Sequence, residues 1–271
     1  MVEATPISVV TVTRNRTAAL LRCVASVAQQ DYTGTVEHVI VVDDNSLEAE
    51  LELEARRLGS AIRIVEVCTS KHEDDFQPFY SVSRIGYLRN CGIARCSGDY
   101  IGYLDDDNTY DPHHLATLAT ILDRDATVDI AYSWRYLWNA DGSPFLEPMY
   151  PWTPGARLAL DHAALSRYIY STLVDVGIRT QGTNIQRDAV IARDGSAVYT
   201  VDTSEMLVRK SVHDFHKWVT RFTWREMTGD FSDDYAFVQN CALAGVRFAC
   251  SNTATLNYYL SGVSNAMSWG A

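Results

Sequence analysis

Residues Tyr100 to Leu115, YIGYLDDDNTYDPHHL, run from an apolar segment into a cluster of acidic residues. The first five residues are apolar or aromatic around one glycine, which is typical of a buried strand. Three carboxylates, Asp105 to Asp107, follow directly, and Asp111 and Pro112 are then placed as the cap and the first residue of a helix. The pattern predicts a strand that ends in an acidic turn, at the sheet edge where open α/β folds bind ligands.

Three adjacent carboxylates repel one another, so a cation or hydrogen-bond donors must stabilise their charges. A hard divalent ion such as Mg²⁺ or Mn²⁺ is the simplest receiver, because it binds one or two carboxylates and completes its shell with phosphate oxygens. The alternative is an acidic turn in front of a helix, which is common in soluble proteins. Both interpretations stay open on this pattern alone.

With 271 residues and 47% hydrophobic content the chain can bury a sizeable core, as one large α/β domain or as two closely packed halves, and we favour one domain over residues 1–271. The net charge of −11 argues against nucleic-acid binding, which uses stripes of Lys and Arg. Six scattered cysteines without C-x-x-C spacing indicate reduced thiols and a cytoplasmic location. Met1 to Pro6 lead into a strand without a signal peptide. No apolar run reaches the length of about 18 residues that spans a bilayer, so no integral membrane contact is expected.

Strands and helices alternate regularly in the first half of the sequence. Strands are predicted over 7–13, 36–42, 62–67 and 100–104, and helices follow at 18–28, 47–59 and 80–96. This order predicts a Rossmann-like, mostly parallel central sheet that is flanked by helices and joined by right-handed crossovers. The turns at 14–16, 43–46 and 105–107 all follow strands, so we expect them to meet at one edge of the sheet.

The second half is less regular and should form the other wall of a cleft. The expected elements are a strand over 129–137 with a turn at 139–142, a helix over 161–174, an extended piece over 181–187, a helix from 231 to 245 and a strand over 246–251. Aromatic and basic residues from Ser204 to Met227 recur at roughly helical spacing, which usually indicates packing. The tail from Tyr258 to Ala271 is interpreted as either a mobile lid or a frayed end.

A resemblance to a known family rests on several segments in order. They are PISVVTVTRNR, VIVVDDNS and YLRNCGIARCSGDYIGYLDDDNTYDPHHL, followed more loosely by QGTNIQRDAVIARDG and DFSDDYAFVQNCALAG. The chain resembles the nucleotide-sugar-dependent glycosyltransferases with the GT-A fold, in particular the inverting family 2 type. The resemblance implies a nucleotide-binding half over 1–125 and an acceptor-binding half over 126–271. It also implies Mn²⁺ or Mg²⁺ and a nucleoside-diphosphate sugar, with UDP as the first choice and dTDP or GDP as alternatives.

The same resemblance places the donor site at the turns after the strands. The residues that it implies are Thr11, Thr13, Arg14 and Arg16 after the first strand, Asp43 and Asp44 after the second, and Arg84 or Arg89 ahead of the fourth. A carboxylate suits the nucleoside, since it accepts hydrogen bonds from a pyrimidine N–H or from ribose hydroxyls. Asp105 and Asp107 satisfy the DxD pattern and are implied as metal ligands, with Asp106 and Asp105 as donor contacts. Helix caps and helix-surface arginines are the alternative roles.

An inverting transferase also needs a base to activate the acceptor hydroxyl. In the family this base is an aspartate at a helix start, a pattern matched here by Gly229 to Asp234. The resemblance therefore implies Asp234 as the base and Asp233, where a glutamate is common, as the second choice. Their alternative role is that of a negative charge favoured by the helix dipole. A histidine that often serves as a third metal ligand has no match, because Tyr258 to Gly262 occupies its neighbourhood.

Rival functions are separated by specific features. A nucleotidyltransferase would open with a glycine-rich phosphate loop, and Val10 to Arg16 contains no glycine. A retaining transferase and a catalytically inactive nucleotide-sugar-binding module both stay as alternatives. The expected acceptor is a small molecule or a saccharide, and a homodimer is compatible with this interpretation.

Overall fold

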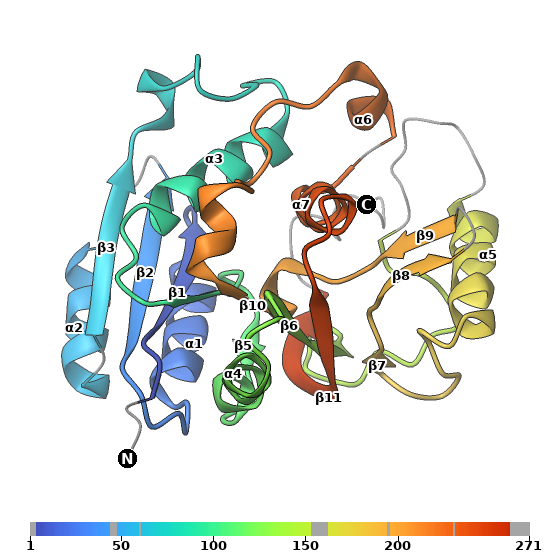
Figure 1. Ribbon diagram of the computed structural model, residues 1–271, viewed down its shortest axis with the longest axis horizontal. Coiled ribbons are helices and arrows are strands. Elements are labelled where there is room, and N and C mark those ends of the chain that lie inside the picture. The colour runs from blue at the N-terminus through green and yellow to red at the C-terminus, as the bar shows by residue number, and fades with distance from the viewer. Residues whose placement is uncertain are drawn as a thin grey trace.

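The computed structural model describes residues 4–43, 48–59, 61–152, 162–193, 196–229 and 231–260, which form an α/β fold (Figure 1). The strands are β1 (Ile7–Thr13), β2 (Val36–Asp43), β3 (Ala61–Val67), β4 (Tyr100–Tyr103), β5 (Thr109–Tyr110), β6 (Ile130–Trp138), β7 (Ile185–Gln186), β8 (Val190–Arg193), β9 (Ser196–Tyr199), β10 (Met206–Arg209) and β11 (Phe248–Tyr259). The helices are α1 (Thr17–Ala28), α2 (Glu48–Leu58), α3 (Ser81–Ile93), α4 (His114–Arg124), α5 (His162–Asp175), α6 (Trp224–Thr228) and α7 (Asp233–Leu243), with short 3₁₀ turns η1 (Thr69–Lys71), η3 (Thr203–Glu205) and η4 (Lys210–Asp214).

The central sheet confirms the predicted, mostly parallel α/β architecture. Its strand order is β3-β2-β1-β4-β10-β6-β11-β5, and β7 pairs with β6. β1 runs parallel to both β2 and β4, β2 runs parallel to β3, and β6 runs parallel to β11. β10 lies antiparallel between β4 and β6, so strands from both halves of the sequence share one sheet. The carboxyl ends of β1, β2 and β4 consequently lie at the same edge.

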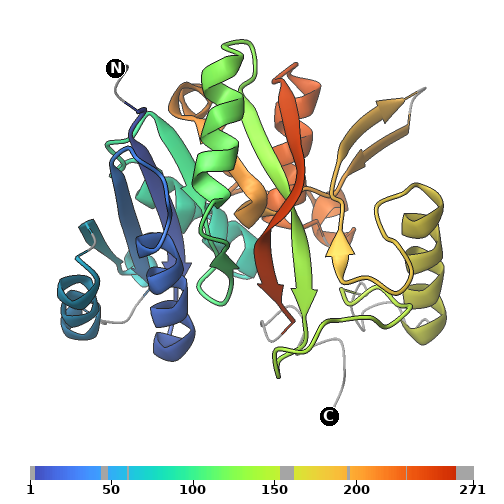
Figure 2. The ribbon, with the colours of Figure 1, turned by 90° about the horizontal axis from the view of Figure 1, so that it is seen from below.

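Helices cover both faces of the sheet, so successive side chains of β1, which point to opposite faces, are buried on both sides. On β1, Val9 packs with side chains of α1 and α4, whereas Val10 packs with side chains of α3 and α7. Figure 2 shows α1 and α4 in front of the sheet and α3 and α7 behind it. Among the described residues, no helix is both long enough and apolar enough to cross a membrane.

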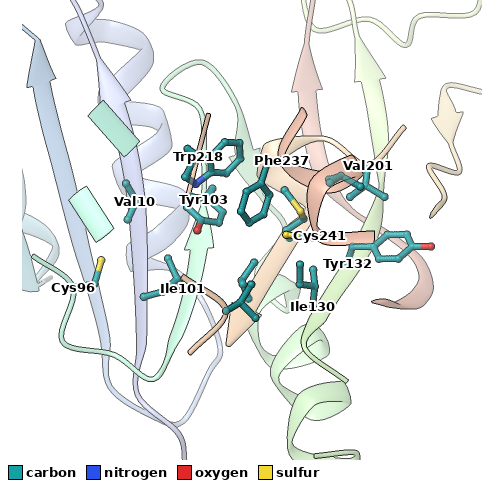
Figure 3. Packing of buried hydrophobic residues seen from close by; sticks show 14 of the residues in the cluster. Val10, Cys96, Ile101, Tyr103, Ile130, Tyr132, Val201, Trp218, Phe237 and Cys241 are labelled. Carbon is teal, nitrogen blue, oxygen red and sulfur yellow. The ribbon is translucent and has the colours of Figure 1, made fainter. Parts of the chain in front are cut away.

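The largest buried ring on the α3 and α7 face belongs to Trp218. It stacks on Phe237 of α7 at a centroid distance of 4.5 Å and meets the edge of Tyr103 of β4 at 5.1 Å. Figure 3 shows these three rings gathered in one cluster. The segment that follows β10 is therefore anchored against both the sheet and α7.

The aromatic stretch from Ser204 to Met227 does not form the helix that its spacing suggested. Met206, Leu207 and Val208 are completely buried and form β10, because a short continuous apolar run suits a central strand with both faces covered. Of the predicted stripe, Trp218 and Phe222 are buried, in agreement with packing. The side chains of Phe215 and Trp224 are 84% and 77% exposed.

Two further boundaries differ from the sequence prediction. Asp111 does not cap the helix after the acidic turn; α4 begins later, at His114, and the Asp111 carboxylate accepts a hydrogen bond of 2.7 Å from the Asn257 side chain. β5 lies between the acidic turn and Asp111, and its pairing with β11 holds Asp111 against that strand. β11 continues to Tyr259, so the start of the predicted tail is sheet, and residues 261–271 lie outside the described residues.

Candidate active site

The turn after β1 contacts the acidic turn after β4 directly. The Thr13 hydroxyl donates to Asp106 Oδ2 at 2.7 Å. The Arg16 guanidinium donates to Asp106 Oδ1 at 2.8 Å and to Asp107 Oδ2 at 2.7 Å. Asn15 adopts a left-handed conformation with φ of 54°, which reverses the chain between these two residues. One cation thus bridges two neighbouring carboxylates, whose oxygens are directed toward the same point.

Arg89 of α3 joins the acidic turn to the start of α7. It donates to Asp105 Oδ1 at 2.9 Å and forms an ion pair with Asp233, while its guanidinium lies 4.6 Å from the centre of the Trp218 ring. Its side chain is only 7% exposed. Arg89 is therefore not a helix-surface arginine, and its two carboxylate partners favour a role in positioning the aspartates.

Asp43, at the end of β2, is held in place before any ligand arrives. Its Oδ1 accepts hydrogen bonds from the Thr69 hydroxyl at 3.0 Å and from Arg84 Nη2 at 2.7 Å. The carboxylate is 5% exposed at the side chain. Arg84 therefore orients Asp43, and the pair lies at the same sheet edge as the acidic turn.

Asp234 lies in the first turn of α7, where its Oδ1 accepts a hydrogen bond of 2.7 Å from the Tyr235 main-chain N–H. Burial raises the pKa of Asp234 above its ordinary value, and the negative charge of Asp202 raises it further. The same Asp202 charge contributes to a raised pKa at Asp105. Asp105, Asp202 and Asp234 therefore share one electrostatic environment.

For Asp105 and Asp106 in the acidic turn, burial changes the pKa more than the paired arginines do. Burial raises the pKa of Asp106 to about 6, although Arg16 and Thr13 act in the opposite direction. Burial likewise raises the pKa of Asp105 to about 7, against the influence of Arg89. Without a further cation, Asp105 and Asp106 therefore hold protons more tightly than isolated carboxylates do.

Not every predicted residue reaches this edge. The Thr11 hydroxyl is completely buried and lies 2.8 Å from His38 Nε2 and 3.5 Å from Cys23 Sγ, so it belongs to the core. Its side chain alternates to the opposite face from that of Val10, as expected for a strand. Arg14 is exposed in the turn after β1. Asp44 lies outside the described residues.

The acidic turn suits a divalent metal ion in its chemistry. Its three aspartates supply hard carboxylate oxygens, and Arg16 already bridges those of Asp106 and Asp107. In the part of the chain that the structure describes, no three acidic, His or Cys side chains form a complete metal cage. Mg²⁺ and Mn²⁺ commonly bind through one or two carboxylates together with substrate phosphates.

Three residues around the site were not identified in the sequence, namely Arg135, Asp202 and Ser204. Asp202 begins the motif DTSE, which forms a complete capping box with Glu205, and this short-range signal was available. Arg135 interrupts the apolar strand segment IAYSWRYLW, and a charge within a buried strand was a second signal. The contact of Ser204 with Asp105 joins residues 99 positions apart, so no local pattern encodes it.

The fold is that of the GT-A glycosyltransferases. The sequence model of Glycosyl transferase family 2 matches residues 8–147, and the chain belongs to this family. The O-antigen biosynthesis protein RfbC of Myxococcus xanthus is 29% identical over 160 residues, which make up 58% of this chain and 12% of that protein. The chain therefore spans only a small part of this relative.

Solved structures share the fold at low sequence identity. TarS 1–349 of S. aureus in complex with UDP superposes with a TM-score of 0.56 and 16% identity, over 94% of this chain and 61% of that chain. The mannosyltransferase PcManGT of Pyrobaculum calidifontis, in complex with GDP-Man and Mn²⁺, gives a TM-score of 0.55 and 13% identity, over 94% of this chain and 57% of that one. These similarities establish the architecture of the chain.

Proposed function

We propose that this chain transfers a sugar, with inversion, from a nucleoside-diphosphate sugar to a hydroxyl of a small-molecule or saccharide acceptor. Asp43 binds the nucleoside, the turn from Asp105 to Asp107 binds the donor and a Mn²⁺ or Mg²⁺ ion, and Asp234 acts as general base. UDP is the expected nucleotide, with dTDP and GDP as alternatives. Family membership and complexes of fold relatives with UDP, UDP-GlcNAc or GDP-Man support this donor class.

One observation carries the assignment of Asp234. The negative charge of Asp202 raises the pKa of both Asp234 and Asp105, which lie 129 positions apart in the sequence. In addition, Arg89 ties the neighbouring Asp233 to Asp105. A base beside a donor-binding turn is what direct displacement at the sugar carbon needs, because the acceptor hydroxyl must lose its proton there.

The chemistry follows from these positions. The raised pKa of Asp234 makes its carboxylate a stronger base than an ordinary aspartate. A divalent ion at Asp105 and Asp107, when bound, supplies Lewis-acid neutralisation of the departing diphosphate. Arg16 lies in contact with the same carboxylates and offers a second positive charge at that place.

The test is release of nucleoside diphosphate from UDP-, dTDP- and GDP-sugars with Mn²⁺, in the presence of a panel of saccharide and small-molecule acceptors. Asp234→Asn should bind donor normally but lose turnover by about 10² to 10⁴, the usual contribution of a general base. Asp74→Asn, an exposed charge change, is the control. Near-native kcat in Asp234→Asn would refute the base assignment, and a wild-type chain that neither binds nor turns over any nucleotide sugar would refute the function.

The retaining transferase and the inactive binding module predict different outcomes. A retaining enzyme gives a product with the anomeric configuration of the donor, which proton NMR of one product determines. A binding module shows a thermal shift with donor and Mn²⁺, since a ligand at a hundred times its Kd stabilises by about 2.7 kcal/mol, but it releases no nucleotide.

A further inference from the structure

Ser204 connects the acidic turn to the second half of the chain through its main-chain and side-chain atoms. It lies in η3, immediately before β10, and is completely buried. Its hydroxyl accepts a hydrogen bond of 3.1 Å from the main-chain N–H of Asp105, the first residue of the acidic turn. Its own N–H donates to Asp202 Oδ1 at 3.0 Å.

Asp202 is itself fixed from the other side by Arg135. The Arg135 guanidinium donates to Asp202 Oδ2, and its Nε lies 3.0 Å from Asp188 Oδ2. The rings of Trp152 and Tyr258 flank this guanidinium at 4.7 and 5.0 Å. A buried guanidinium with two carboxylate partners and two ring contacts has little freedom to move.

We propose that Ser204 is a positioning residue for the acidic turn, the last member of a hydrogen-bonded chain that runs from Arg135 through Asp202 to the Asp105 main chain. The inference rests on the proposed function in taking this turn as the donor and metal site. It adds a residue from the acceptor-binding half that holds the main chain of the donor-binding turn.

The reason for such an anchor lies in the other contacts of the turn. Arg16 and Arg89 hold the three aspartates through their charged side chains, and an incoming metal ion or diphosphate competes for those same charges. The Ser204 contact is between a neutral hydroxyl and a main-chain N–H. It consequently persists when the charges around the carboxylates are rearranged.

The chain offers a matched control for this proposal. Ser133 of β6 is also completely buried, and its hydroxyl has no hydrogen-bond partner among the described residues. Ser204→Ala and Ser133→Ala therefore remove the same atom from equally buried positions. They differ in whether that atom accepts a hydrogen bond from the Asp105 N–H.

The experiment has a structural and a functional readout. Hydrogen exchange of the Asp105 amide, followed by NMR, should accelerate at least tenfold in Ser204→Ala and stay at the wild-type rate in Ser133→Ala. In Ser204→Ala the Kd for Mn²⁺ with UDP should rise several-fold and kcat/KM should fall about tenfold, while Ser133→Ala stays within twofold of wild type.

Unchanged Asp105 exchange in Ser204→Ala would overturn the proposal. Equal losses in both serine variants, together with equal falls in melting temperature, would also overturn it, because they would reflect general loosening of the core. Faster exchange in Ser204→Ala alone supports the anchor even if the wild-type chain binds no nucleotide. A wild-type chain that binds no nucleotide would instead refute the proposed function.

Discussion

Asp106 provides a quantitative test of whether burial or pairing controls the acidic turn. Its pKa rises from 3.8 to about 6 because burial outweighs Arg16 and Thr13. In the unfolded chain Asp106 ionises near its ordinary pKa, whereas in the folded chain it keeps its proton up to about pH 6. Between these two values the folded state binds more protons, so this residue's contribution to stability is lost as pH rises.

The substitution Asp106→Asn removes this titration. At about 1.36 kcal/mol for each tenfold change in proton affinity, the stability of the variant relative to wild type should increase by about 2 kcal/mol between pH 4 and pH 7. The measurement is urea unfolding of both proteins at half-unit pH intervals, without metal or nucleotide. Asp74→Asn, which removes an exposed charge, should show no comparable trend.

A difference between Asp106→Asn and wild type that stays flat or shrinks as pH rises would refute the reasoning. It would mean that the bonds from Arg16 and Thr13 stabilise the ionised carboxylate by more than burial costs it. Repetition with Mn²⁺ gives a further check, because a bound cation favours the ionised form and should reduce the pH dependence of the wild type.

Three other substitutions test separate parts of the site and fold. Asp107→Ala should lower kcat by at least about a hundredfold and weaken Mn²⁺-dependent nucleotide binding, since metal assistance is worth several kcal/mol; intact Mn²⁺ binding in a titration would contradict this. Asp43→Ala should raise the donor KM by about tenfold or more and change kcat less, because charge-assisted hydrogen bonds contribute about 1.5–3 kcal/mol; a pure kcat defect would argue against nucleoside binding. Gly98→Ala should cost about 1–3 kcal/mol in urea unfolding, because its Cβ would lie 2.6 Å from the Ser8 nitrogen, whereas Gly102→Ala, with 3.6 Å to its nearest neighbours, should be mild; equal losses would exclude this clash as the cause.

The sequence was sufficient to predict the parallel strands of the first half and the edge where their turns meet, because both depend on local patterns. β-branched runs that end in polar turns specify parallel strands, and the topology then brings Thr13, Arg16 and the aspartates together. The segment before Trp218 was misread, since aromatic spacing alone does not distinguish a helix from a buried strand followed by a loop. Thr11 was misplaced because strand alternation directs its hydroxyl to the core.

The site contacts that the sequence did not predict are long-range contacts. Arg89 could be assigned only as a residue near the site, because its two carboxylate partners come from segments 16 and 144 positions away. The bond between Ser204 and Asp105 depends on β10 lying beside β4, and that neighbourhood exists only in the folded sheet.

The insertion of β10 between β4 and β6 has a consequence for how the chain can be divided. The region that the family shares, residues 8–147, ends long before this strand, yet without it β4 and β6 would face each other across an unfilled gap with unpaired main-chain groups. Such open strand edges recruit other chains. A recombinant fragment that stops after β6 should therefore aggregate, and any chimaera that borrows a new acceptor-recognition segment must retain residues 202–209 to remain a single folded unit.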